Sequence, residues 1–167
     1  MGSQRVIQNQ AIRLRWLGNY LLLGGVAGLG IAMWSFAHII QPTGVVLLLY
    51  ALIFGFCVHT IFCARLLLKG LLENGLWNTK LNLILQTLQF SVMGYTWEVC
   101  AGLGVILGYD FNTYKPTFAT IIPNFSIVLN GGNDDLTIGI NVIALLAFIY
   151  VDRFERQLER ELSVFEN

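Results

Sequence analysis

The chain has 167 residues, of which 56% are hydrophobic and 12% are charged, and its ten Lys and Arg balance ten Asp and Glu. The mean hydropathy is +0.66, whereas a soluble globular domain carries roughly one quarter charged residues. This composition argues against a soluble domain, and we expect lipid to cover many of the apolar side chains. The basic residues form no stripe of the kind that binds nucleic acid.

The basic residues gather in three clusters between long apolar stretches, and only Lys115 lies outside them. The nine clustered residues are Arg5, Arg13, Arg15, Arg65, Lys69, Lys80, Arg153, Arg156 and Arg160. Because short loops rich in Lys and Arg stay on the cytoplasmic side of a membrane, the pattern predicts an even number of crossings. We expect an integral protein of the bacterial cytoplasmic (inner) membrane with both termini in the cytoplasm.

Two apolar segments near the N-terminus, about 16–40 and 45–68, are long enough to be membrane spans. A helix of about 20 residues crosses the hydrocarbon core. The residues between the two segments, Gln41 to Gly44, include a proline and a glycine that favour a tight turn. The sequence therefore predicts an antiparallel helical hairpin with its turn outside the cell.

The third predicted span, about 81–107, is the least apolar. It carries a row of polar residues at helical spacing, namely Asn82, Gln86, Gln89 and Thr96. Polar groups in hydrocarbon need protein or water partners, so we expect this face to line a pore or to contact neighbouring helices.

Glu98 is the most informative single residue, because an ionisable group inside a span is costly and is by default a functional hypothesis. At 1.5 Å per residue, Glu98 and His59 lie at similar predicted depths, and His38 lies near the outer end of the first span. Two interpretations stay open. These residues form a proton or ion site, or a buried hydrogen bond that fixes the helix register.

Two pairs of glycines at four-residue spacing, Gly24 with Gly28 and Gly104 with Gly108, resemble the motif that lets membrane helices approach closely. The motif serves either packing within one chain or contact between subunits.

The predicted outer loop, 108–136, is much longer than the roughly 2–8 residues that usually join helices. We expect it to be structured, as a folded cap on the spans, a re-entrant segment or a partner-docking strand. The fourth predicted span, 137–151, continues into a cytoplasmic amphipathic helix at 152–167. Its apolar residues Phe154, Leu158, Leu162 and Phe165 are predicted to dock on a partner.

The expected fold is an all-α integral membrane protein in which residues 1–167 form a single transmembrane domain with four spans. The chain has no catalytic or nucleotide-binding motif and no Cys/His spacing typical of a metal site. We therefore expect no enzymatic activity, no cofactor and no metal.

The leading functional hypothesis is a structural subunit of a larger membrane complex that serves secretion, conjugation or another envelope process. Its partners would be the lipid bilayer and other membrane subunits or copies of itself. The alternative is a homo-oligomeric channel, pore or small proton- or ion-coupled transporter lined by the third span.

Overall fold

The computed structural model describes residues 2–40, 43–128 and 136–166. Within this part of the chain it has four helices and six strands. In chain order they are α1 (Gly2–Ala37), α2 (Gly44–Leu68), α3 (Leu72–Thr87), β1 (Leu88–Val92), β2 (Tyr95–Cys100), β3 (Gly104–Asp110), β4 (Lys115–Ile121), β5 (Asn124–Val128), β6 (Leu136–Asn141) and α4 (Val142–Glu166).

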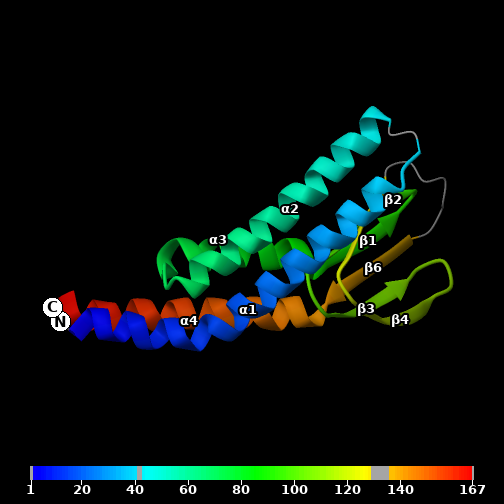
Figure 1. The fold of residues 1–167 in the computed structure, drawn as a ribbon. Helices are drawn as coiled ribbons and strands as arrows, with labels where there is room; N and C mark the ends of the chain where they lie inside the picture. Colours follow the sequence, from blue (N-terminus) through cyan, green and yellow to red (C-terminus); the bar gives the residue numbers. More distant parts are fainter. Residues whose placement is uncertain (1, 41–42, 129–135, 167) are drawn as a thin grey trace.

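Helices α1 and α2 form an antiparallel hairpin (Figure 1). Two segments, Leu14–Ala37 and Gly44–Leu68, are long and apolar enough to cross a membrane. Only 28% and 17% of the residues in their most apolar stretches are buried. A core helix of a soluble protein of this length would be mostly buried, so their exposure favours a lipid environment. The Thr43 hydroxyl accepts a hydrogen bond from the Val46 amide at 3.4 Å and caps the start of α2.

The predicted third span is wrong. Residues 81–107 contain the end of α3, strands β1 and β2, and the start of β3. Apolar and polar residues alternate from Leu88 to Val99 with the period of two that a strand requires. Met93 and Gly94 both have positive φ angles, of 49° and 84°, and form the two-residue turn of a β-hairpin.

The predicted fourth span and outer loop are also wrong. The loop contributes β3, β4 and β5, residues 136–141 form β6, and α4 begins at Val142. Asn141 stabilises this start, because its side-chain oxygen accepts a hydrogen bond from the Ala144 amide at 3.3 Å. The described chain is therefore a mixed α and β protein with two membrane-capable helices, and the all-α four-span fold is incorrect.

The six strands form one antiparallel sheet in the order β4-β3-β6-β1-β2-β5. Helix α3 runs directly into β1, and β6 runs directly into α4. Since β1 and β6 are neighbours, α3 and α4 are brought together at one end of the sheet. Figure 1 shows the sheet at one end of the molecule and both chain termini at the other.

The main core lies among the helices. Its largest fully buried side chains include Leu14, Leu17, Leu21, Leu67, Leu76, Leu83 and Val151. Phe154 and Leu158, which the sequence assigned to partner docking, are buried in this same core. The chain itself therefore covers these two side chains, while the side chains of Leu162 and Phe165 lie outside the described residues.

One face of the sheet is apolar, and its part on β1, β3, β4 and β6 is uncovered. Directly opposite residues form a row across four strands, namely Phe118, Leu107, Ile140 and Leu88, and these side chains are 41–69% exposed. A second exposed row contains Tyr109, Ile138 and Phe90. We call these seven residues the apolar sheet face, and the alternation of side chains makes the opposite face polar.

Candidate functional site: a polar hollow on the sheet

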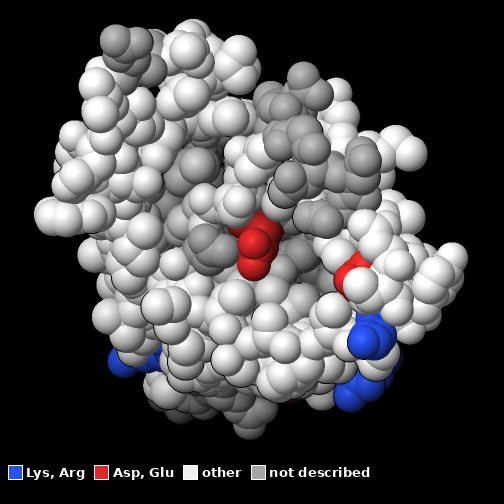
Figure 2. Space-filling view, turned by 90° about the vertical axis from the view of Figure 1, so that its right-hand side faces the viewer, with Lys and Arg blue, Asp and Glu red and all other residues white. Residues whose placement is uncertain are grey.

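The polar face of the sheet encloses a hollow of about 170 Å³. One row of opposite residues runs through it, from Thr117 through Gly108 and Gly139 to Gln89. Gln89 and Glu98 flank the paired residues Phe90 and Trp97, so Glu98 continues this row on β2. Figure 2 shows an acidic side chain at the bottom of a hollow.

A second row of the polar face consists of hydroxyl-bearing residues. Ser91 lies opposite both Thr137 and Thr96, and the hydroxyl oxygens of Ser91 and Thr96 are 3.0 Å apart, which is a hydrogen-bond distance. The three side chains line the hollow next to Glu98.

Two glycines, Gly108 and Gly139, face each other on β3 and β6 at the hollow. A Cβ atom on Gly108 would lie 2.6 Å from Oγ1 of Thr117, and one on Gly139 would lie 2.8 Å from Cγ2 of Ile106. Both distances are too short for a methyl group, so this pair of facing positions accommodates only glycine without a shift. The Thr117 and Ile106 side chains therefore lie close over the backbone of these two glycines.

Gln89 supplies a buried amide to the hollow, and Glu98 supplies a carboxylate. Gln89 is only 5% exposed, and its Nε2 atom has no hydrogen-bond partner among the described residues. Neither of the two ion pairs found in the described part of the chain involves Glu98. A buried amide without a partner is unfavourable by about 1–3 kcal/mol, which makes the hollow a candidate site.

Asp110 lies on the polar face but belongs to the turn between β3 and β4. Its carboxylate accepts hydrogen bonds from the Thr113 hydroxyl at 2.7 Å and from the Asn112 amide at 2.8 Å. These bonds hold the pKa of Asp110 below its ordinary value. The carboxylate therefore stabilises its own turn.

A second group of polar side chains is buried behind the sheet, between α2 and α3. The Asn82 amide donates to the Thr60 hydroxyl at 2.8 Å and accepts from the Gln86 amide at 2.6 Å, and Gln86 in turn accepts from the backbone amide of Ala101 at 2.9 Å. His59 lies at the side of this chain of bonds, 3.4 Å from Asn82. We call Thr60, Asn82, Gln86 and His59 the buried polar ladder.

The structure separates the residues that the sequence grouped. Gln89, Thr96 and Glu98 line the hollow, while Asn82, Gln86 and His59 belong to the ladder. The hydrogen-bond partners found for His59 are Asn78, Asn82 and Cys63 rather than Glu98. The proton-site and register interpretations of Glu98, His59 and His38 therefore stay predictions, and the structure shows no contact between Glu98 and His59 among the hydrogen bonds found in the described residues.

His38 lies apart from both groups, near the turn of the hairpin. Its Nδ1 atom is 2.8 Å from the backbone oxygen of Trp34, and the two rings are 4.5 Å apart.

Gly24 and Gly28 of α1 lie against the sheet, and Gly28 also lies near Cys57 of α2. A Cβ atom on Gly24 would overlap the backbone oxygen of Ala101, and one on Gly28 would overlap the Phe125 ring. The Tyr20 hydroxyl, one turn earlier, donates to the backbone oxygen of Leu103 at 2.8 Å. Gly104 and Gly108, the second predicted pair, lie within β3.

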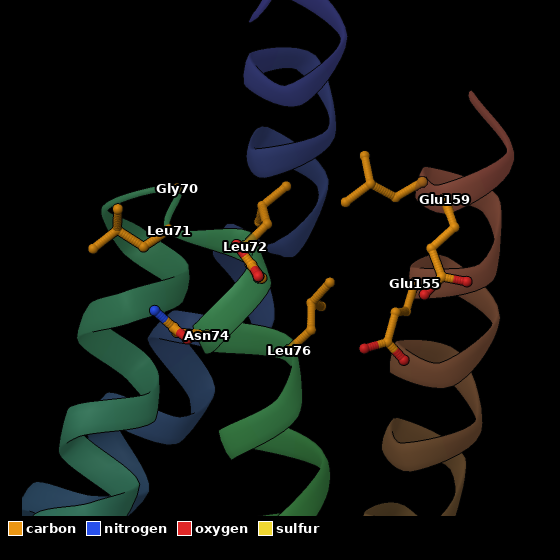
Figure 3. A pocket seen from close by; sticks show the side chains of 9 residues that line it. Gly70, Leu71, Leu72, Asn74, Leu76, Glu155 and Glu159 are labelled. Carbon is orange, nitrogen blue, oxygen red and sulfur yellow. The ribbon is translucent and has the colours of Figure 1, made fainter. Parts of the chain in front are cut away.

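At the opposite end of the molecule, a groove of about 460 Å³ lies between the start of α3 and α4. Figure 3 shows Leu72 and Leu76 pointing from α3 toward α4, where Glu155 and Glu159 face them. Glu155 forms an ion pair with Lys80, so this groove has an apolar floor and an acidic wall.

The three cysteines, Cys57, Cys63 and Cys100, are buried and unpaired. Burial raises the pKa of the Cys100 thiol above its ordinary value. No group of three His, Cys, Asp or Glu side chains that could hold a metal ion occurs among the described residues.

No protein-family model, curated protein or solved structure matches this chain. The sequence interpretation missed three residues of the hollow, namely Thr117, Thr137 and Gly139. They lie on β4 and β6, far along the chain from Glu98, and the pairing of distant strands has no local signal.

Proposed function

We propose that this protein is a non-enzymatic subunit of a larger membrane complex. In this proposal the α1–α2 hairpin holds the chain in the bacterial cytoplasmic membrane, and the apolar sheet face contacts a neighbouring subunit. The basic end of the molecule, which carries both termini, lies in the cytoplasm. The observation that carries the proposal is the uncovered apolar sheet face.

An apolar sheet face is normally buried against another layer of structure. A soluble monomer rarely leaves a contiguous apolar patch larger than a few hundred Å² exposed. The seven side chains of the apolar sheet face have no such layer within the described part of the chain, so we infer that something outside this chain covers them.

The position of the sheet favours protein over lipid as that cover. Gly24 and Gly28, which contact the sheet, lie near the middle of the membrane-capable segment Leu14–Ala37. The sheet would therefore reach membrane depth, where the unpaired backbone groups of its edge strand β4 cannot face hydrocarbon. A protein neighbour satisfies the edge and the apolar face together.

The test is the mass of the native particle after extraction in a mild detergent. The chain alone has a mass of 18.7 kDa, and the proposal predicts a larger particle in native mass spectrometry. Replacing Leu107 and Phe118 together by Ser should release the single chain, whereas replacing the exposed Thr117 by Ser should not. A wild-type particle that contains only one chain would refute the proposal.

A homo-oligomeric pore is the second candidate, because Gln89, Thr96 and Glu98 share the polar face of the sheet. In this version copies of the sheet surround a polar path. A native particle whose mass is a whole multiple of the single chain, together with ion conductance in a planar bilayer, would favour it. A particle that contains other chains would favour the heteromeric complex.

A further inference from the structure

We propose that the polar hollow binds a primary ammonium group, carried by a small soluble amine or by a lipid headgroup such as ethanolamine. This proposal is independent of the proposed function, because it rests on the hollow and not on the apolar sheet face. The evidence is the charge of the hollow, its hydrogen-bonding groups and its size.

The charge of the hollow selects a cation. Among the described residues that line it, Glu98 is the one carboxylate, and none is Lys or Arg. An anion would meet the Glu98 carboxylate with no compensating positive charge. A divalent metal ion takes six or more oxygen ligands, and the described residues hold no group of three His, Cys, Asp or Glu side chains that could bind one. One negative charge matches a singly charged ligand.

The remaining groups suit a donor of several hydrogen bonds. An ammonium group has three N–H donors, and the hollow offers the Glu98 carboxylate and the hydroxyl oxygens of Thr96 and Thr137 as acceptors. Gln89 adds a side-chain amide, and its Nε2 atom has no hydrogen-bond partner among the described residues. A half-turn of this amide breaks no bond of that nitrogen and presents the amide oxygen, which is an acceptor, in its place.

The size of the hollow suits a small group. Its volume of about 170 Å³ corresponds to about five or six water molecules in the liquid, at about 30 Å³ each. A primary ammonium with a short chain fits this space.

The experiment uses the full-length protein in a neutral detergent and methylammonium as the probe, with binding followed by saturation-transfer NMR on the methyl protons. We expect saturable binding to the wild type that is at least tenfold weaker in Glu98→Gln. Glu73→Gln, which removes an equal charge in the groove at the other end of the molecule, should bind like the wild type. Tetramethylammonium, which has no N–H donor, should bind more weakly than methylammonium.

A second variant guards against misfolding of Glu98→Gln. Thr137→Val removes a hydroxyl acceptor from the hollow with little change of shape and none of charge, and it should also weaken binding. Absence of saturable binding to the wild type, or equal binding to wild type and Glu98→Gln, would overturn the proposal. Methylammonium binding to the protein in lipid nanodiscs distinguishes a lipid headgroup from a soluble amine as the natural ligand. If phosphatidylethanolamine weakens methylammonium binding relative to phosphatidylcholine, the headgroup is the ligand, and if it does not, the ligand is a soluble amine.

Discussion

Asn82 connects α2 to α3 and, through Gln86, to the backbone at Ala101. It is fully buried, and a buried polar group that loses its partner is unfavourable by about 1–3 kcal/mol. Two partners depend on it, the Thr60 hydroxyl and the Gln86 amide. At the scale of single residues, this side chain therefore has the largest expected effect on stability within the ladder.

We predict that Asn82→Ala lowers the free energy of unfolding by about 2–4 kcal/mol, because two buried partners are left unsatisfied. Asn74→Ala is the matched control on the same helix, since the Asn74 side chain is exposed. It should have an effect of about 1 kcal/mol or less. Denaturant unfolding in detergent, followed by tryptophan fluorescence, measures both. Equal losses would show that the ladder has no special role.

The sequence identified the polar residues that need partners but not the elements on which they lie. It identified Asn82, Gln86, Gln89, Thr96 and Glu98 as polar groups that need partners, and the structure gives Asn82 and Gln86 such partners. It placed all five on one helix, because the polar residues of α3 and those of β1 and β2 follow one another by chance at helical spacing. The pairing of Glu98 with His59 was inferred from depth alone, and the structure bonds His59 to α3 residues instead.

At the scale of elements, the hairpin and the sheet are joined by close backbone contact. Gly24 lies where α1 touches the turn between β2 and β3, with no room for a Cβ atom beside the Ala101 oxygen. Gly30, also within α1, faces open space, and a Cβ atom added there would meet no neighbouring side chain or strand within 4 Å. The two glycines therefore form a natural pair for testing this junction.

We predict that Gly24→Ala destabilises the protein by about 2–3 kcal/mol or more, because the added methyl group forces α1 away from the sheet. Gly30→Ala should be neutral or stabilising by up to about 1 kcal/mol, since alanine favours a helix over glycine. Thermal unfolding in detergent distinguishes the two variants. If Gly24→Ala is as stable as Gly30→Ala, the hairpin does not pack on the sheet in this way.

A helix or strand could be predicted where a continuous stretch of the sequence carries its pattern. The α1–α2 hairpin has two long apolar runs joined at a proline and glycine, and both membrane-capable helices occur where the sequence placed them. The sheet was missed because its strands, of five to seven residues, are shorter than the window that identifies a span. Their high apolar content, which reflects the apolar sheet face, resembles that of a membrane helix when averaged over about 20 residues.

At the scale of the whole molecule, the two faces of the sheet have opposite character. One face carries the hollow around Glu98, and the other carries the rows from Phe118 to Leu88. A sheet of this kind suits a boundary between a polar compartment and an apolar one. The account of the protein as a complex subunit depends on protein, and not lipid alone, covering the apolar side.

The most direct test places a photoreactive phenylalanine analogue on the edge strand β4 in cells. At Phe118, which is 69% exposed on the apolar sheet face, irradiation should give an adduct with another protein chain. At the neighbouring Thr117, which points to the opposite face, it should give no such adduct. If the analogue at Phe118 crosslinks only to lipid, or if both positions crosslink to protein equally, the apolar sheet face is not a subunit contact.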